Sequence, residues 1–465
     1  MWPLIGSACS GSGNGEPKML FVRQARFWLA LSAELILLAT LNRFDDWRYA
    51  TMPVRFVEAG VLSGIAYFAA NSFFAQLFSD RTVRVVFWSA AILFRLAVLP
   101  LLPGDDLWRY QWEGKVQNAG FNPYVLAPND DRLTGVREEY PDWVRINHRD
   151  FSAIYPPGTE LIFAGLSRAG AGPLAYKLLF AAADLGVVAL LLRLIGGRER
   201  YLDAAWYAWN PLVVYSFAGA AHFDSLMILP MLAGILCFVR SRAAPEPAMQ
   251  WRWALLGAVA MGAAISIKLV PLLLLPVCAF ALGRRAWALG LSLGIPALLS
   301  LPFGVPQVPI WQSLGKFIYV ARVNDIFWWL IEESFWPNPH QKNFQYNVVI
   351  VIAVVLVSLF FLRNWRRGLL WAMGTALILS PILHPWYLTW ILPLAAWRRV
   401  DAWQVLSVTI FAYYLFWNER LFLLPWHSEP WLRGFILIPP IVAMLVALRR
   451  RTPNELEGAG LAGSG

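Results

Sequence analysis

The chain has 465 residues, of which 58% are hydrophobic and only 15% are charged. Soluble domains are typically about 45–50% apolar and about 25% charged, so this composition excludes an ordinary soluble domain. The formal net charge of +10 is expected to reflect basic cytoplasmic loops of a membrane protein, and we expect no nucleic-acid partner.

Apolar runs near the roughly 18 residues needed to cross a bilayer recur from end to end and predict an all-α polytopic membrane protein. An outer-membrane barrel would instead show alternating segments of about 10 residues. Hydropathy predicts about fourteen transmembrane helices, in a range of about 11–14. The expected spans are 26–42, 57–78, 83–103, 173–194, 203–219, 222–240, 252–269, 270–283, 286–304, 346–363, 368–383, 386–398, 402–418 and 432–449.

The loops between these windows carry arginine on alternate sides of the membrane. With the N-terminus in the cytoplasm, every short loop on the cytoplasmic side holds at least two arginines, such as Arg81 with Arg84 and Arg398 with Arg399. This is the pattern that orients helical membrane proteins. It predicts which loops face the outside.

On this orientation the chain divides into two tails and one membrane domain. Residues 1–25 form a cytoplasmic N-terminal tail, 26–449 a single transmembrane domain, and 450–465 a flexible cytoplasmic tail. The two long polar loops, 104–172 and 305–345, are extracytoplasmic and are expected to carry short interfacial helices. The acids, histidines and aromatics collected on this outer face predict a site there.

The first long loop opens with GDDLWRYQWEGKVQNAGFNPY (104–124), in which two helical stripes carry the polar residues. Asp106, Tyr110 and Gly114 lie on one stripe, and Asp105, Arg109 and Glu113 on the other. A carboxylate held among aromatics near the membrane surface can have a raised pKa and act as a general base on an acceptor hydroxyl. A charged helix held by an Arg109 ion pair fits the spacing equally well.

Other polar residues fall on the same outer side. Tyr155 lies in a stiff Tyr-Pro-Pro stretch, and His148 in the same loop is either a base or a solvated histidine. His222 and Asp224 precede an external helix, where they line a cavity or Asp224 caps the helix. No set of ligands with metal spacing is present, and we expect no metal and no cofactor.

Three further stretches suit a phosphate or a sugar. Lys268 stands at an outer helix end, where it either snorkels to the interface or pairs with a phosphate. His384 begins HPWYLTW, in which Trp386 and Tyr387 suit a sugar ring at the membrane edge. Arg322, in an amphipathic stretch of the second long loop, could lie near a lipid phosphate.

Two ionisable residues fall inside the predicted bilayer. Asp184 has no partner that the sequence identifies, and Arg95 could snorkel outward. Neither receives a role from the sequence.

The order of these motifs resembles that of a known superfamily. The pattern Asp-x-x-x-Tyr-x-x-x-Gly followed by GFNPY, and later HFDSL, IKLVPLLLLP and HPWYLTW, resembles the GT-C superfamily of integral membrane glycosyltransferases. It looks closest to bacterial polyprenyl-phosphate-mannose-dependent mannosyltransferases, over most of 83–398. The resemblance implies a GT-C-like bundle around a cavity that opens to the membrane, in a bacterial inner membrane, with its active site facing the exterior.

The resemblance also implies a reaction. A single sugar, commonly mannose, passes with inversion and without a metal from a polyprenyl-phosphate donor to a lipid or glycan acceptor. Asp106 or Asp105 is the expected general base, and Asp106 is preferred. The expected phosphate-binding residues are Lys268, Arg322 and His384. The expected substrate-binding residues are Arg109, Tyr110, Glu113, Asn122, Tyr124, Tyr155, His222, Asp224, Trp386 and Tyr387.

Two other functions fit parts of the sequence. A transporter or flippase of lipid-linked sugars would use the same external cations but would not need the acid pair, and the internal repeat common in transporters is not evident. A glycan ligase would transfer a preassembled chain from a lipid-diphosphate donor. The acid motif favours the single-sugar transferase.

Overall fold

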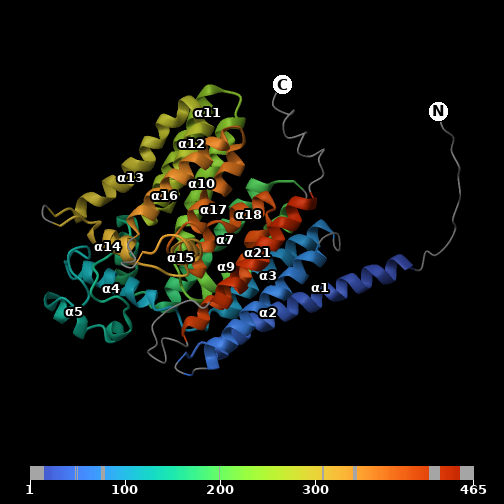
Figure 1. Cartoon of the computed structure of the whole chain (residues 1–465), viewed down its shortest axis with the longest axis horizontal. Helices are drawn as coiled ribbons and strands as arrows, with labels where there is room; N and C mark the ends of the chain where they lie inside the picture. Colours follow the sequence, from blue (N-terminus) through green and yellow to red (C-terminus); the bar gives the residue numbers. More distant parts are fainter. Residues whose placement is uncertain are drawn as a thin grey trace.

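The computed structural model describes residues 15–47, 49, 51–74, 79–197, 199–305, 308–338, 343–417 and 430–450. This part of the chain is built from helices with two isolated β-bridges (Figure 1). Much of both predicted cytoplasmic tails, residues 1–14 and 451–465, lies outside it. The helix that begins at Gly15 includes residues that we had expected in the N-terminal tail.

The α-helices are numbered along the chain. They are α1 (Gly15–Thr40), α2 (Thr51–Phe74), α3 (Asp80–Val98), α4 (Asp106–Asn118), α5 (Thr134–Glu138), α6 (Pro157–Arg168), α7 (Pro173–Ile195), α8 (Arg200–Ala208), α9 (Pro211–Val214), α10 (Asp224–Ala243), α11 (Pro247–Ile267), α12 (Leu275–Leu282), α13 (Gly290–Ser300), α14 (Gln312–Val320), α15 (Ile326–Ser334), α16 (Phe344–Phe360), α17 (Trp365–Ile378), α18 (Leu392–Arg398), α19 (Asp401–Thr409) and α21 (Pro430–Arg450). A π-helical turn, Tyr215–Gly219, follows α9, and 3-10 helices at Pro385–Trp390 and Ile410–Leu415 flank α18 and α19.

The all-α architecture expected of a membrane protein is confirmed. Among the described residues, six helical segments are long and apolar enough to cross a bilayer. They are Phe21–Arg43, Thr51–Phe74, Pro173–Ile195, Asp224–Ala243, Val270–Phe303 and Pro430–Arg449. The helices Gln345–Phe360 and Leu362–Ile378, bent by 79° at their junction, would make a seventh as one broken span. The predicted windows 83–103 and 252–269 lie largely on α3 and α11, of 19 and 21 residues, which are not among these segments. The remaining predicted windows form shorter helices, and the number fourteen stays a prediction.

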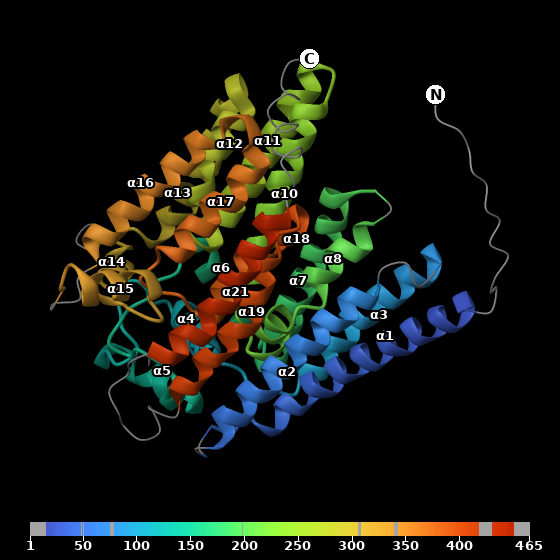
Figure 2. The same ribbon diagram turned by 45° about the vertical axis from the view of Figure 1, so that its right-hand side comes forward.

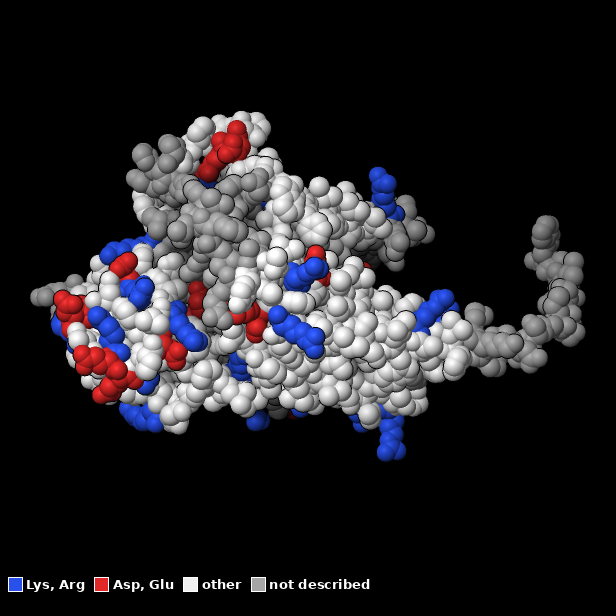
Figure 3. Space-filling view, turned by 90° about the horizontal axis from the view of Figure 1, so that it is seen from below, with Lys and Arg blue, Asp and Glu red and all other residues white. Residues whose placement is uncertain are grey.

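The two long loops gather at one end of the molecule. Helices α4 and α5 of the first loop and α14 and α15 of the second lie together at the same end in two views, far from the turn between α10 and α11 (Figures 1 and 2). On the face shown in Figure 3, acidic and basic side chains concentrate at the end that carries α4 and α5, whereas much of the remaining surface is uncharged. This end therefore brings together segments about 200 residues apart in the sequence.

Asp184 and Arg95 form a buried ion pair. Arg95 Nε donates to Asp184 Oδ2 at 2.8 Å, and the Tyr207 hydroxyl donates to Asp184 Oδ1 at 2.7 Å. A second guanidinium nitrogen donates to the carbonyl oxygens of Ala91 and Ala208. The expectation that Arg95 could snorkel outward is wrong, because an ionisable group in an apolar interior is stabilised by pairing with another. The pair joins α3, α7 and α8.

Candidate functional site

A cavity of about 1280 Å³ lies at the end of the molecule that carries the long loops. Residues from both predicted outer loops and from the ends of several helices line it. Of the predicted site residues, those in its wall are Asp105, Asp106, Arg109, Tyr110, Tyr155, His222, Lys268, Arg322, His384, Trp386 and Tyr387. Glu113, Asn122, Tyr124 and Asp224 are not in the wall.

The segment before α4 is fixed at several points, which sets the position of the acid pair. The ammonium of Lys177, in α7, donates to the carbonyl oxygens of Leu99 and Leu101. The amide of Leu102 donates to Asp45 Oδ2 at 2.7 Å, and the amide of Gly104 to the carbonyl of Ala220 at 2.9 Å. Asp105 and Asp106 follow as the N-cap and the first residue of α4.

Asp106 is held in a way that suits a base. Its Oδ1 accepts a hydrogen bond from Asn147 Nδ2 at 2.7 Å, and its Oδ2 lies 3.6 Å from Nδ1 of His222. Burial, with a further contribution from the negative charge of Asp105, raises the pKa of Asp106 to about 7. A group with that pKa is close to the optimum for general base catalysis at neutral pH.

The two aspartates face different groups. Asp106 lies within electrostatic range of Lys268, Asp224 and the phenol of Tyr155. Asp105 lies within range of Tyr215 and Tyr414, whose rings pack with Trp47 or Phe56 in an aromatic wall of the cavity. Asp106 thus lies within range of the ammonium of Lys268, and Asp105 borders the aromatic wall.

Lys268 follows the end of α11 and lies in a cage. Its ammonium donates to Asp224 Oδ1 at 2.6 Å and lies 5.0 Å from the ring centres of Phe223, Tyr387 and Trp390. Trp390 Nε1 donates to the same carboxylate oxygen at 2.6 Å. The lysine side chain stays 14% exposed, toward the cavity. Asp224 makes no capping hydrogen bond at the start of α10, so it orients Lys268 instead.

Three rings form a continuous stack beside Asp106. His222 stacks on Trp386 with 3.8 Å between ring centres and 16° between planes, and His384 stacks on the same indole at 4.3 Å and 7°. His384 Nδ1 is 3.1 Å from the hydroxyl of Tyr413. Burial, and then the charge of Lys268, lower the pKa of His384 to about 3. A neutral imidazole can contact a phosphate only as a hydrogen-bond donor.

Arg109 contributes to the site indirectly. Its Nε donates to Glu113 Oε1 at 2.6 Å, and its other nitrogens donate to the carbonyl oxygens of His148 and Phe151 at 3.1 and 2.6 Å. The ion pair that the spacing allowed is therefore present. It ties α4 to the loop that holds Asn147, and so orients a partner of Asp106.

The tyrosine and the glycine of the acid motif face α6. Tyr110 stacks on Phe163 at 4.8 Å. A Cβ atom added at Gly114 would lie 2.3 Å from the carbonyl oxygen of Phe163, so only glycine allows this approach. The motif thus combines Asp106, which lines the cavity, with two residues that pack α4 against α6, and Tyr110 does both.

Asn122 and Tyr124 connect loops outside the cavity wall. Asn122 Nδ2 donates to the carbonyl of Phe303 at 2.8 Å, and the Tyr124 hydroxyl donates to the carbonyl of Tyr155 at 2.6 Å. Their side chains hold Tyr155 and the second long loop near the first.

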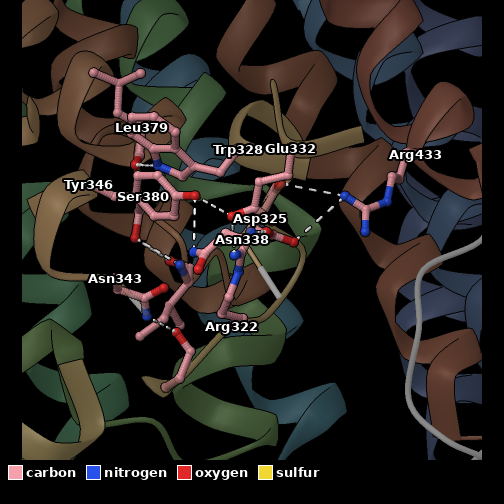
Figure 4. Close-up of polar contacts among 12 residues, drawn as sticks. Arg322, Asp325, Trp328, Glu332, Asn338, Asn343, Tyr346, Leu379, Ser380 and Arg433 are labelled. Atoms are coloured by element: carbon pink, nitrogen blue, oxygen red, sulfur yellow. Dashed lines mark hydrogen bonds and ion pairs between the residues drawn. The ribbon is translucent and has the colours of Figure 1, made fainter. Parts of the chain in front are cut away.

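Arg322 forms ion pairs with two acidic residues (Figure 4). Its guanidinium donates to Asp325 and, at 2.6 Å, to Glu332, and Asp325 also lies 3.6 Å from Arg433 of α21. The neighbouring Val323 forms a parallel bridge to Ile382, two residues before His384. The network anchors this wall of the cavity, and the two carboxylates balance the charge of Arg322.

Among the residues that sequence reasoning missed are three that contact the predicted site residues: Asn147, Trp390 and Tyr413. Trp390 is the last residue of the HPWYLTW motif, so a signal for it was present. Asn147 belongs to an irregular loop with no periodicity, and Tyr413 to an apolar run, so neither had a signal. Within the described residues, no group of three or more His, Cys, Asp or Glu side chains is arranged to hold a metal ion.

The fold and the cavity define a membrane protein whose acids and cation face one cavity at the end of a helical bundle. Over residues 33–284, more than half of its length, the chain matches the family described as alpha-(1->6)-mannopyranosyltransferase, N-terminal domain. The chain therefore belongs to this family of mannosyltransferases, and the resemblance that the motifs carry is confirmed. The matched region includes Asp106, His222 and Lys268 and ends before His384.

A relative supports the same assignment. The chain is 24% identical over 389 residues to a probable alpha-(1->6)-mannopyranosyltransferase of Mycolicibacterium smegmatis, an alignment that covers 71% of this chain and 67% of the relative. No solved structure matches the chain.

Proposed function

We propose that this protein transfers a single mannose from a polyprenyl-phosphate donor to a hydroxyl of a lipid or glycan acceptor, outside the cytoplasm of a bacterial inner membrane. The observation that carries the proposal is one cavity in which Asp106, with a pKa of about 7, faces the caged ammonium of Lys268. A base of that pKa and a cation beside it are the two groups that sugar transfer from a lipid phosphate requires.

The proposed reaction is a single displacement. The acceptor oxygen forms a bond to the anomeric carbon while the bond from that carbon to the phosphate oxygen breaks, which inverts the configuration. Asp106 takes the proton of the acceptor hydroxyl. The lipid phosphate leaves with an added negative charge, which Lys268 stabilises at short range. Holding the donor and the acceptor together in the reactive orientation supplies the remaining lowering of the barrier, without a covalent intermediate.

The surroundings of the cavity suit a lipid-borne donor. Phe317 of α14 lines the cavity. Helices α14 and α15 and the residues after α15 expose large apolar side chains, among them Phe335 and Trp336. Apolar side chains on short amphipathic helices bind at the interface between water and lipid. A polyprenyl chain could therefore remain in the bilayer while its phosphate reaches Lys268.

Purified protein incubated with radiolabelled polyprenyl-phosphate mannose and membrane lipids tests the proposal. We expect labelled glycosidic product from the wild type and a loss of roughly 10²–10⁴-fold in Asp106→Asn, the usual contribution of a general base. Lys268→Met is expected to lower kcat about 10²–10³-fold, whereas Lys316→Met, at an exposed lysine of α14, serves as the matched control.

Two outcomes would contradict the proposal. Transfer that survives replacement of both Asp105 and Asp106 by asparagine would remove the proposed base. Movement of the lipid-linked sugar across the bilayer without any glycosidic product would favour the transporter instead.

A further inference from the structure

His222 lies close to Asp106, and the proposed reaction gives it no role. Its Nδ1 atom is 3.6 Å from Asp106 Oδ2. The imidazole is only 4% exposed, and its buried Nδ1 has no hydrogen-bond partner among the described residues. A buried polar atom without a hydrogen-bond partner is energetically unfavourable, so its presence in a folded protein needs an explanation, such as a role in catalysis.

The imidazole is held in one orientation. Its flat face stacks on Trp386, which stacks on His384 in turn. Its backbone amide donates to the carbonyl of Ser216 at 2.8 Å, in the π-helical turn before it. Interruptions of this kind in helices are frequent at functional sites.

The backbone just before His222 is strained. Ala221 has a φ of +63°, in the left-handed region that residues with a Cβ rarely adopt. Such a conformation persists only where the surrounding contacts impose it. Here the left-handed conformation of Ala221 directly precedes the residue whose imidazole faces Asp106.

We infer that His222 is a positioning residue for Asp106: its Nδ1–H, 3.6 Å from Oδ2 of the carboxylate, donates to that oxygen once the contact shortens to hydrogen-bond distance, and holds the carboxylate in the orientation that takes the acceptor proton. The inference rests on the proposed role of Asp106. Asn147 already donates to Oδ1, so each carboxylate oxygen would have one donor and a lone pair left for the proton.

The imidazole acts as a donor and not as the base. Burial, together with the charges of Lys268 and His384, holds the pKa of His222 well below its usual range. The ring is therefore neutral at physiological pH and does not compete for the proton that Asp106 receives. A hydrogen bond to the ionised form of a carboxyl lowers its pKa.

The pH dependence of transfer can isolate this contact because the other groups around Asp106 stay the same between variants. Those that face it from the packed elements are Asp105, Asn147, Lys268, Asp224, Tyr110, Tyr155 and Tyr387. Removal of the donor at position 222 should then raise the pKa of Asp106.

Three substitutions separate hydrogen bonding from stacking. His222→Asn places an amide nitrogen where Nδ1 lies, His222→Gln places one nearer to Nε2, and His222→Phe keeps a flat ring on Trp386 without a donor. For His222→Phe we expect the acid limb of kcat/KM to move up by roughly one pH unit, and kcat to fall about tenfold to a hundredfold with little change in donor KM. His222→Asn should restore the wild-type pH profile and most of kcat, and His222→Gln should not.

A purely structural role predicts the opposite order, because phenylalanine preserves the stack and asparagine does not. An unshifted acid limb in His222→Phe, or equal impairment of His222→Asn and His222→Phe, would overturn the inference. Loss of activity in all three variants without any rescue by asparagine would point to His222 itself as the base, and would also overturn it.

A readout that does not need transfer separates this inference from the proposed function. Carbodiimides modify protonated carboxyls, so the extent of labelling at Asp106, located by peptide fragmentation, reports its pKa. We expect the labelling midpoint to rise in His222→Phe and to return in His222→Asn. If wild-type protein transfers no mannose, the proposed function fails, whereas an unmoved midpoint refutes the contact with His222.

Discussion

At the scale of single residues, the site depends on how two adjacent aspartates differ. Both stand at the N-terminus of α4, but Asp106 has Asn147, His222 and Lys268 nearby, and Asp105 faces Tyr215 and Tyr414. The sequence indicated both acids and preferred Asp106 by spacing alone. Only three-dimensional packing separates their surroundings.

The different surroundings predict a pH dependence. Asp106 must be ionised to accept a proton, so kcat/KM should rise as pH increases through its pKa of about 7. The negative charge of Asp105 raises that pKa, so Asp105→Asn should lower it and shift the acid limb to lower pH, by roughly one unit. The variant should remain active above pH 7. A variant that is inactive at every pH would instead identify Asp105 as the base.

At the scale of helices, α4, α6 and α11 fix the position of Asp106, the proposed base, relative to Lys268. Gly114 lets α4 contact the backbone of α6. Thr159 of α6 donates to the carbonyl of Ile267 at 2.6 Å, directly before Lys268, and Gly158 lies against Ser266. A displacement between α4 and α6 would therefore move Asp106 relative to Lys268.

This packing predicts a large effect from one methyl group. In Gly114→Ala the new Cβ meets backbone atoms of Phe163 that cannot rotate away, so we expect a loss of about 1–3 kcal/mol of stability and a lower kcat. Gly135→Ala in α5 is the matched control, because nothing lies within 4 Å of the added Cβ. Thermal unfolding in detergent and the transfer assay measure both. Equal stability of the two variants would contradict the proposed contact.

The sequence could predict only those features of the site that leave a local pattern of residues. The spacing of Asp106, Tyr110 and Gly114 indicated a helix, and that helix is α4. Thr159 and Gly158 belong to no motif, and their contacts with α11 join residues more than 100 positions apart. Contacts of that range follow from the packing of whole helices, which no local pattern contains.

At the scale of the whole molecule, the Arg95–Asp184 pair connects α3, α7 and α8. The sequence showed two isolated ionisable residues, 89 positions apart. Their pairing depends on which helices become neighbours. Two buried charges that satisfy each other are tolerated, whereas either one alone is strongly disfavoured.

We therefore expect Arg95→Leu to destabilise the protein by about 3–5 kcal/mol, because it leaves the Asp184 carboxylate buried and unpaired. The double variant Arg95→Leu with Asp184→Leu should recover much of that loss, since it removes both charges. Unfolding temperatures of the wild type, both single variants and the double variant form a complete cycle. Additive losses in the double variant would show that the two residues do not stabilise each other.

The proposed function also requires that the end of the molecule with α4 and α5 faces away from the cytoplasm. That end is opposite the turn between α10 and α11 (Figures 1 and 2). Arg240 and Arg242 lie in the last turn of α10, directly before that connection, as basic residues on the cytoplasmic side would require. In a variant without the three native cysteines, exposed Val144 and Glu246 provide one test position at each end. A membrane-impermeant maleimide should label Val144→Cys in right-side-out spheroplasts and Glu246→Cys only after lysis. The reverse pattern would place the cavity in the cytoplasm, and the donor, the acceptor and the proposed reaction would then all have to be reassigned to that side.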